Sequence, residues 1–357
     1  MQKKTIIHFI YSLGRGGAEN MLVQALKELQ EYNNIVVTLY EDNRFEKELQ
    51  CAEYICLNKR SLWSLPVSVI AFRKLVKKYK PELVHSHLLL PNFIARLSTP
   101  RRIPLVTTIH NSVSKDFDYG RWVIRKLDRF TYRFRRSVII AVSEIARQEY
   151  FTFLKARPLK SHLLYTFVDE NIFNKKTPVK PSGKKFRIVA VGALRKQKNF
   201  EFLIEEFTKI KSLPVELHIY GDGILESGLQ KLIGKNGVHV VLKGEVTNIH
   251  EILPKYDLYV SSSYYEGFSL AVLEAMAMKL PLLLSDIKSF REQCRDTAWY
   301  FNVDKSDDFI SKLKTIMASA EKRNLLSAKA QKRVLENFTL SQHVAKLKEI
   351  YAETFAL

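Results

Sequence analysis

Cysteine is scarce in this sequence, and long apolar runs are missing. The three cysteines, Cys51, Cys56 and Cys294, form no Cys-x-x-Cys pair. They cannot build a disulfide framework or a thiolate metal site, so we expect reduced, structural thiols. No apolar run approaches the ~18 residues that span a bilayer, and the apolar stretch in residues 1–11 is too short for a signal peptide and lacks a cleavage site. These absences favour a cytosolic protein.

Acidic side chains are few relative to basic ones. The 357 residues carry 57 lysines and arginines against 37 aspartates and glutamates, a net charge of +20. Residues 1–180 contribute +15 of this charge. Such an asymmetry favours an anionic partner for the first half, either a membrane surface or a nucleic acid, and a charge that merely keeps the protein in solution is the alternative.

The chain is long enough for two domains, since its length exceeds what one core usually serves and 46% of its residues are apolar. Residues 5–11 favour a β-strand, 13–17 form a glycine-rich turn and 18–31 have a helical pattern. Similar β-runs alternate with helix-length segments throughout, at 35–40, 83–86, 104–110, 138–142, 186–191, 215–220, 238–242, 258–261 and 282–284. This alternation predicts an α/β protein of doubly wound parallel sheets with helices on both faces.

The domain boundary is expected in residues 174–185, which are rich in proline, glycine and charge and read as a linker. We therefore expect a first domain over residues 1–177 and a second over 178–337. Residues 338–357 predict a terminal helix long enough to cross back to the first domain. The two Rossmann-like domains are expected to face one cleft.

Residues 266–277 carry the most informative pattern of the second half. They follow an apolar strand and enter a helix at about Ser269. A helix start offers free backbone N–H groups and about half a positive charge, which suits a diphosphate. Gly267 permits close approach of the backbone, and Ser269 is a competent N-cap. Glu274 lies further along the helix and can point toward a ribose diol, whereas Glu266 precedes it; a capped core helix with two incidental glutamates is the alternative.

Arg195 and Lys198 lie in the loop after the predicted strand 186–191, at the carboxyl edge where such sheets bind ligands. Arginine binds phosphate oxygens bidentately and lysine acts as a point charge, so the two would stabilise a departing diphosphate without a metal. A solvated charge run is the alternative. Glycine-rich turns at 14–17 and 221–223 occupy similar strand ends; each is weak evidence alone, and the first favours close approach of a substrate to the backbone.

Three histidines end predicted strands. His110 closes the strand 104–110, and His85 and His87 close the one before it. A strand-end histidine is more often structural than functional. No carboxylate or cysteine stands at ligand spacing beside these three, so we expect neither a metal nor another cofactor.

Together, these stretches resemble the retaining GT-B glycosyltransferases of family 4, the group with a Glu-x7-Glu motif, over essentially the whole chain. The matching stretches are residues 16–19, 84–87, 108–110, 142–144, 192–199, 221–223, 266–277 and 285–286. Their order and spacing are more specific than any single motif. One departure is Ala193, where the family often has an arginine, and Arg195 is expected to substitute for it.

The resemblance implies a role for each matching residue. Glu266 contacts hydroxyls of the donor sugar, and Glu274 binds the ribose. Arg195 and Lys198 grip the diphosphate. His110 lies near the reacting carbon, which completes the expected catalytic set of His110, Glu266, Arg195 and Lys198. Further donor contacts are expected at Gly16, Gly17, Gly223, Gly267, Phe268, Ser269 and Leu270.

The resemblance also implies retention of configuration at the anomeric carbon. In such a reaction the leaving diphosphate oxygen accepts the proton of the acceptor on the same face of the sugar, so catalysis rests on positioning and on stabilising the leaving charge. Asp116 and Asp118 resemble the acidic pair that holds a divalent ion in another glycosyltransferase class. They lie in a polar loop with no apolar strand before it, so we interpret them as a coincidence.

The acceptor side is expected in the first half, at Glu19, His87 and a basic helix. Within residues 121–136, one helical stripe consists of Arg121, Arg125, Arg129 and Arg133, and another of Val123, Leu127, Phe130 and Phe134. The ordinary interpretation packs the apolar stripe on the sheet. The cationic stripe would in addition rest on anionic headgroups, at ~1 kcal/mol per basic residue, and present a lipid-linked acceptor. The basic residues 59–80, with Trp63, add to this surface.

The leading hypothesis is a retaining, metal-independent hexosyltransferase that uses a nucleotide diphosphate sugar and a saccharide or lipid-linked acceptor. It would serve cell-surface polysaccharide or lipopolysaccharide biosynthesis in the cytoplasm, peripherally on the inner face of the plasma membrane. Another GT-B enzyme, a nucleotide-sugar epimerase or a disaccharide synthase, is the alternative. A nucleic-acid-binding protein is disfavoured, because no recognised module appears and the aromatic residues follow apolar stripes.

Overall fold

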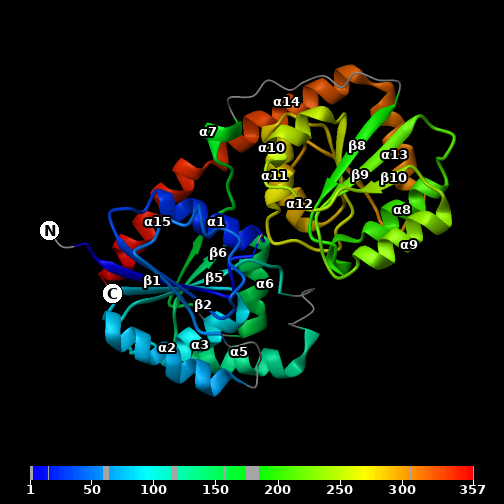
Figure 1. Cartoon of the computed structure of the whole chain (residues 1–357). Helices are drawn as coiled ribbons and strands as arrows, with labels where there is room; N and C mark the ends of the chain where they lie inside the picture. The colour runs from blue at the N-terminus through cyan, green and yellow to red at the C-terminus, as the bar shows by residue number, and fades with distance from the viewer. Residues whose placement is uncertain are drawn as a thin grey trace. The chain divides into compact units, whose positions relative to one another are not determined.

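The computed structural model describes residues 3–14, 16–58, 64–113, 120–155, 158–173, 185–305 and 307–356. It divides the chain into two compact units (Figure 1). Met1–Thr166 and Leu340–Leu357 form the first unit, and Phe167–Thr339 forms the second. The change of unit precedes the expected linker, because Val168 already bridges to Thr339 within the second unit. Residues 174–184 of that linker lie outside the described part.

The first unit is built on a parallel sheet of seven strands in the order β3-β2-β1-β4-β5-β6-β7. The strands are β1 (Thr5–Ile10), β2 (Asn33–Thr38), β3 (Glu53–Cys56), β4 (Leu83–His87), β5 (Leu105–Ile109), β6 (Val138–Ala141) and β7 (Lys160–Leu163). One face carries α2 (Leu65–Tyr79), α3 (Leu89–Ser98), α5 (Trp122–Phe134) and α6 (Glu144–Leu154), and the other carries α1 (Gly17–Lys27) and α15 (Leu340–Phe355) (Figure 1). The last helix of the chain therefore completes the first unit.

Burial on both faces takes in polar as well as apolar residues in the middle strands of this sheet. A parallel sheet covered on both faces exposes neither side of its central strands, and every residue of β4, β5 and β6 is buried. Phe9, Phe72 and Phe93 lie in the core beneath α2 and α3, and Leu22 and Leu26 of α1 lie in the core on the opposite face. Burying each such side chain contributes about 1.5–3 kcal/mol.

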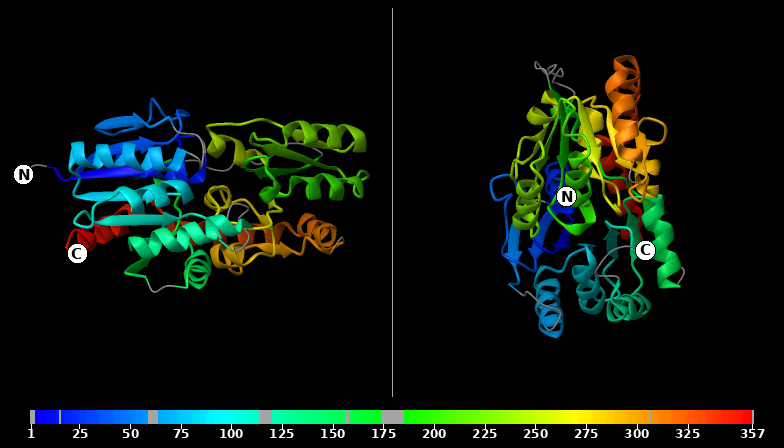
Figure 2. Two further views of the ribbon diagram at one scale, coloured as in Figure 1. Left: turned by 90° about the horizontal axis from the view of Figure 1, so that it is seen from below. Right: turned by 90° about the vertical axis from the view of Figure 1, so that its right-hand side faces the viewer.

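The second unit has a parallel sheet of six strands in the order β10-β9-β8-β11-β12-β13. The strands are β8 (Phe186–Val191), β9 (Val215–Tyr220), β10 (Val240–Leu242), β11 (Leu258–Ser261), β12 (Leu282–Ser285) and β13 (Trp299–Phe301). The longer helices cover both faces of this sheet (Figures 1 and 2). One face carries α8 (Phe200–Thr208), α9 (Glu226–Asn236) and α13 (Asp308–Ala318), and the other carries α11 (Leu270–Ala277), α12 (Lys288–Cys294) and α14 (Ala320–Asn337). Short helical segments are α7 (Glu170–Phe173), η2 (Lys196–Lys198), α10 (Ile249–Ile252) and η3 (Leu253–Lys255). The predicted fold class, two doubly wound parallel α/β domains, is confirmed.

The helix α5 turns a different face inward from the one its sequence predicted. Val123, Phe130 and Phe134, expected to pack on the sheet, are 50%, 61% and 53% exposed. The inward face is anchored by Asp128, which accepts a hydrogen bond at 2.5 Å from Arg96 of α3 in an ion pair that is almost fully buried. Leaving either charge buried without the other would be strongly destabilising, so this pair fixes the rotation of α5. The buried residues of the helix are Ile124, Asp128, Thr131 and Tyr132.

Candidate active site

Two loops of the second unit meet around Glu266. The strand β8 leads into η2, which carries Lys198, and β11 leads into the loop that carries Glu266. Because β8 and β11 are neighbouring parallel strands, both loops leave the same edge of the sheet. Lys198 Nζ donates to Glu266 Oε1 at 2.7 Å. The two side chains are 17% and 8% exposed, so this ion pair is largely shielded from water.

Two neutral donors also hold the Glu266 carboxylate. Ser263 Oγ donates to Oε1 at 2.7 Å, and Gln197 Nε2 lies 3.3 Å from Oε2. The same amide nitrogen of Gln197 donates to the Tyr265 carbonyl at 2.9 Å, and the Tyr264 N–H donates to the Gln197 carbonyl at 2.9 Å. The sequence did not identify a role for Gln197 or Ser263, although Gln197 lies within the stretch 192–199 and Ser263 lies three residues before Glu266.

The glycines at this edge allow two loops to pack backbone against backbone. A Cβ at Gly221 would collide with the carbonyl oxygen of Gly192, and a Cβ at Gly223 would lie 2.7 Å from the carbonyl oxygen of Leu194. The Leu194 N–H donates to the Asp222 carbonyl at 2.7 Å across the same junction. Gly223, predicted to contact the donor, therefore has a packing role that is sufficient to require glycine.

The start of α11 differs from the prediction in one hydrogen bond. Ser269 is its N-cap residue, but the hydroxyl makes no capping bond. The side-chain amide of Gln293 in α12 binds the backbone of Ser269 instead: its Oε1 accepts from the Ser269 N–H at 3.0 Å and its Nε2 donates to the Ser269 carbonyl at 2.8 Å. The Ser269 N–H is therefore engaged within the protein, and the donor contact at this helix start stays a prediction. Gly267 and Leu270 flank the helix start, and the Phe268 ring packs against Phe338.

Glu274 and Arg195 occupy different environments at the same edge. Glu274 lies in the middle of α11, and burial raises the pKa of its carboxyl to about 8. Among the described residues, no side chain donates a hydrogen bond to it, so its oxygens remain available to a ligand. Arg195 precedes η2, and its side chain is exposed. Its backbone carbonyl accepts from the Lys198 N–H at 3.0 Å, which ties the two cations into one turn.

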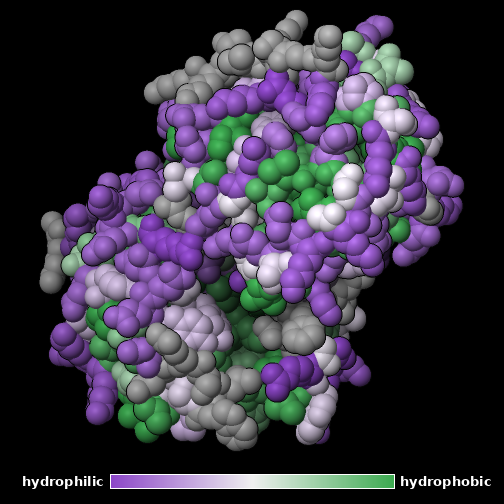
Figure 3. All heavy atoms as spheres, turned by 45° about the vertical axis from the view of Figure 1, so that its right-hand side comes forward, coloured by the Kyte–Doolittle hydropathy of each residue, from purple (hydrophilic) through white to green (hydrophobic). Residues whose placement is uncertain are grey.

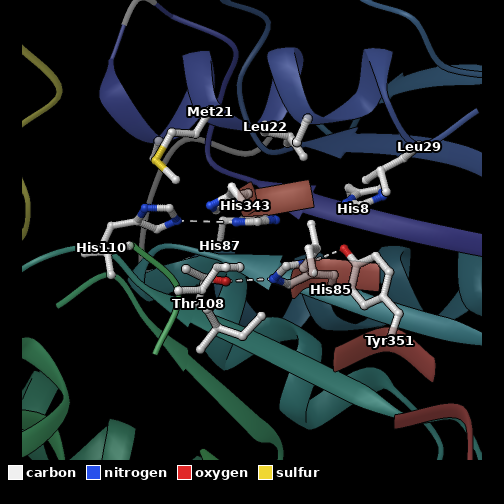
Figure 4. Close-up of a pocket in the computed structure, with 16 residues that line it drawn as sticks. His8, Met21, Leu22, Leu29, His85, His87, Thr108, His110, His343 and Tyr351 are labelled. Carbon is white, nitrogen blue, oxygen red and sulfur yellow. Dashed lines mark hydrogen bonds between the residues drawn. The ribbon is translucent and has the colours of Figure 1, made fainter. Parts of the chain in front are cut away.

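In the first unit, five histidines gather between the sheet and the helices α1 and α15 (Figure 4). His8 of β1 is the register partner of His85 of β4, and His87 lies two residues further along β4 on the same face. His87 Nδ1 lies 3.3 Å from His110 Nε2. The fifth, His343, comes from α15 and hydrogen-bonds the Tyr165 carbonyl at 2.8 Å through Nδ1.

Burial keeps these imidazoles neutral. It lowers the pKa of His8, His110 and His343 to about 4 each. Burial also holds the pKa values of His85 and His87 well below the usual range, and the neighbouring histidines lower them further. A neutral ring donates from one nitrogen and accepts at the other. His110 therefore offers hydrogen bonding, rather than a positive charge, at neutral pH.

The cluster fits a buried water better than a metal ion. Nitrogen atoms of His8, His85 and His87 lie within 4.8 Å of one another around a cavity of about 30 Å³. Both nitrogens of His85 are already engaged, by Tyr351 at 2.6 Å and Thr108 at 2.7 Å. Among the described nitrogen atoms of His8, His85 and His87, only His8 Nδ1 and His87 Nε2 lack a partner, whereas a zinc ion takes three or four protein ligands. Two nitrogen atoms and this volume suit one water molecule.

The remaining predicted residues of the first unit lie near α1 and α5. Gly16 is the N-cap residue of α1 and Gly17 begins it. The Glu19 carboxylate folds back over Gly16 so closely that a Cβ there would collide with it. Arg125 and Arg133 are exposed on α5, but Arg129 is bound to α6, where Nε donates to the Phe153 carbonyl at 2.8 Å. Asp116, Asp118 and residues 59–63 lie outside the described part.

Two doubly wound units with polar loops at the carboxyl ends of their strands define the GT-B class, and comparison with known families identifies the chain within it. The model of Glycosyl transferases group 1 matches residues 171–333, and that of Glycosyltransferase Family 4 matches residues 15–172. The chain belongs to these glycosyltransferases.

Curated relatives match over nearly the full length. A Campylobacter jejuni enzyme, N-acetylgalactosamine-N,N'-diacetylbacillosaminyl-diphospho-undecaprenol 4-alpha-N-acetylgalactosaminyltransferase, is 26% identical over 93% of this chain and 95% of its own. The O-antigen biosynthesis glycosyltransferase WclY of Escherichia coli is 23% identical over 98% of both chains. Among solved structures, Anabaena HepE in complex with UDP and glucose has a TM-score of 0.84, with 16% identity over 97% of this chain and 99% of its own.

Proposed function

We propose that this glycosyltransferase transfers a sugar from a nucleoside diphosphate donor with retention of configuration and without a metal ion. The observation that carries this proposal is the shielded Lys198–Glu266 pair at the strand edge of the second unit, together with the Glu274 carboxyl on the helix α11 that follows. A cation, a carboxylate for sugar hydroxyls and a second carboxyl for a ribose are the groups that such a donor needs. HepE, which shares the fold, was solved with UDP-glucose, so UDP-sugars are the first donors to test.

The chemistry follows from what these side chains can stabilise. The bond between the anomeric carbon and the diphosphate oxygen breaks, and the bond to the acceptor oxygen forms on the same face. The leaving diphosphate oxygen takes the acceptor's proton, so no separate base is required. Lys198 and Arg195 stabilise the charge that develops on the diphosphate, and Glu266 orients the sugar through its hydroxyls.

A thermal-shift panel of UDP-, GDP- and dTDP-sugars tests donor binding, because a ligand at 100 times its Kd stabilises by about 2.7 kcal/mol. NMR of the product's anomeric proton tests retention. Replacing Arg195 or Lys198 by alanine should cut the rate severely, whereas EDTA should leave it unchanged. Loss of activity in EDTA that manganese or magnesium restores would contradict the metal-independent mechanism.

The acceptor is proposed to be a saccharide carried on a lipid, in the assembly of a cell-surface polysaccharide. The C. jejuni relative is named for a diphospho-undecaprenol-linked acceptor, and the E. coli relative for O-antigen biosynthesis. A second candidate is a synthase that uses a small soluble acceptor, because a Bacillus anthracis relative, 23% identical over 83% of this chain and 82% of its own, is N-acetyl-alpha-D-glucosaminyl L-malate synthase. Transfer to L-malate or to a sugar phosphate would favour this alternative.

The exposed face of α5 supports a peripheral position on an anionic membrane, which would be the inner face of the plasma membrane. Trp122 is 66% exposed, beside the equally outward Phe130 and Phe134. Basic side chains alternate with these rings: Lys126 Nζ lies 4.7 Å from the centre of the Trp122 ring, and Lys126, Arg129 and Arg133 line a shallow depression with the two phenylalanines. Aromatic rings flanked by cations are typical of membrane-surface helices.

Other features agree with a surface location rather than an inserted one. In the described part of the chain, no helix combines the length and apolar character needed to cross a bilayer. Figure 3 shows hydrophobic side chains reaching the surface in small patches among hydrophilic ones. Exposed Val67 and Ile70 on α2 place further apolar groups on the sheet face that also carries α5 (Figure 1).

A further inference from the structure

We infer that Lys198 and Glu266 form an exchangeable ion pair: a donor's diphosphate draws Lys198 away from Glu266, and Gln197 and Ser263 keep the released carboxylate in place. This inference rests on the proposed function. It assigns Gln197 and Ser263 as positioning residues and makes Lys198 the group whose contact differs between the free and the donor-bound enzyme.

The ion pair sets up a competition for one cation. Lys198 Nζ is committed to Glu266 Oε1 at 2.7 Å, although it is the best-shielded cation of this loop. A diphosphate oxygen at bonding distance from the same Nζ would lie beside the Glu266 carboxylate. At so short a distance, the diphosphate and the carboxylate repel each other, because the site is shielded from water. Lysine carries its charge on a flexible stem, so turning the ammonium group toward the diphosphate relieves the conflict.

The Glu266 carboxylate has enough other donors to stay in position. Ser263 Oγ shares Oε1 with Lys198, and Gln197 Nε2 approaches Oε2. Both donors are fixed from behind. Gln197 is bound to the backbone of Tyr264 and Tyr265, and the Ser263 carbonyl accepts from Ser285 Oγ at 2.6 Å. When Lys198 leaves, these two bonds still orient the carboxylate toward the sugar.

The loop also leaves room for the lysine stem. A Cβ at Gly192 would lie 2.8 Å from Lys198 Cε and 3.1 Å from Cδ. The stem therefore lies directly against the glycine backbone. Ser262 Oγ meanwhile donates to the Lys198 and Asn199 carbonyls at 2.9 and 2.8 Å. The backbone of Lys198 is thus held in place, while its side chain lies against Gly192, which has no side chain.

The decisive experiment measures UDP and GDP binding by calorimetry in the wild type and in Glu266→Gln, which keeps the shape of Glu266 but removes its charge. Exchange predicts that Glu266→Gln binds the preferred nucleotide about fivefold to tenfold more tightly, the scale of one shielded charge pair, although transfer falls. Lys198→Met should weaken binding. In the Lys198→Met background, Glu266→Gln should yield at most a small part of that gain, because the lysine that it releases is absent.

Glu205→Gln is the matched control. Glu205 is exposed on α8, and its substitution by glutamine changes the net charge by the same amount as Glu266→Gln. Its nucleotide affinity should equal that of the wild type. If neither nucleotide binds the wild type and none of the UDP-, GDP- and dTDP-sugars raises its melting temperature, the proposed function fails. If one binds but Glu266→Gln binds it equally or more weakly, the proposed function stands and the exchange is wrong.

The positioning residues have their own test. Ser263→Ala and Gln197→Ala should lower kcat for sugar transfer by about tenfold each, the effect of one lost orienting hydrogen bond, and leave the Kd for the nucleotide within twofold of the wild type. Ser263→Thr, which keeps the hydroxyl, should recover most of kcat. Equal losses in kcat and nucleotide affinity, or no recovery with threonine, would show that these residues only support the fold.

Discussion

At the scale of single residues, the proposed role of Glu274 of the second unit in donor binding depends on the ionisation of its carboxyl group. A carboxyl with a pKa near 8 is mostly protonated at pH 7, yet a ribose diol is bound best by the ionised form, which accepts both hydroxyl protons. Binding should therefore release a proton. Affinity for the donor should rise up to tenfold per pH unit below pH 8 and level off above it.

Calorimetry with UDP-glucose between pH 6 and 9 measures this dependence, since the esterified phosphates of that donor do not titrate in the range. In Glu274→Gln the affinity should fall and its pH dependence should disappear. An unchanged affinity in that variant would remove the ribose assignment.

Gly221 offers a test of backbone packing at the same edge. Its φ of +139° and the collision of any Cβ with the Gly192 carbonyl predict that Gly221→Ala destabilises the second unit by about 2 kcal/mol or more. Gly228 of α9 has open space around it, so Gly228→Ala should stabilise by about 0.5–1 kcal/mol. Urea unfolding followed by fluorescence measures both. If Gly221→Ala leaves the free energy of unfolding unchanged, the two loops can move apart without loss of stability.

At the scale of elements, α5 carries the surface that we propose binds anionic membranes. Replacing Arg125, Arg129 and Arg133 by glutamine should reduce sedimentation with anionic vesicles, and added salt should do the same to the wild type as the Debye length falls below ~10 Å. Because Arg129 is bound to Phe153, the variant that keeps Arg129 and changes only the other two should show most of the loss.

A matched control replaces three basic residues of the second unit, Lys231, Lys235 and Lys314, by glutamine. It lowers the charge equally and should leave vesicle binding unchanged if the surface on α5 is responsible. If the variant on α5 sediments like the wild type, this face is an ordinary solvated one. Phe130→Ser should weaken binding even at low salt, because it removes apolar contact rather than charge.

Three of the four edge strands are elements that the sequence did not predict. β3, β7 and β13 all lie at the margins of their sheets. In a covered parallel sheet only the central strands are buried on both faces, so only they require long apolar runs. β7 contains Lys160 and His162, and β3 begins with the exposed Glu53, which leaves no clear periodic signal. The central strands β8, β9 and β11 were predicted with the bounds that the structure has.

For the molecule as a whole, the buried histidines make the first unit sensitive to acid. Their folded pKa values near 4 lie below the unfolded value of about 6.5. Between these values the unfolded chain binds more protons, so stability is complete above pH 6.5 and falls as pH decreases toward 4, by up to about 1.4 kcal/mol per pH unit for each histidine. Thermal unfolding from pH 7.5 to 4.5 measures the slope, and His8→Asn should reduce it.

The sequence alone determined the alternation of strands and helices and the location of the loops that we propose bind the donor. These features are local, since strand periodicity, glycine turns and the segment 266–277 can be recognised within short windows. It also identified His110, Glu266, Arg195 and Lys198 as candidates through their order along the chain.

The tertiary structure decided what depends on residues far apart in sequence. The Arg96–Asp128 pair set the rotation of α5 against its own apolar pattern, because a buried charge requires its partner whatever the helix periodicity. Gln293 of α12 bound the backbone of Ser269 at the start of α11, and β1, β4 and α15 assembled the histidines. Side-chain contacts of this kind depend on which strands become neighbours, and the pattern within a single segment contains no information about that.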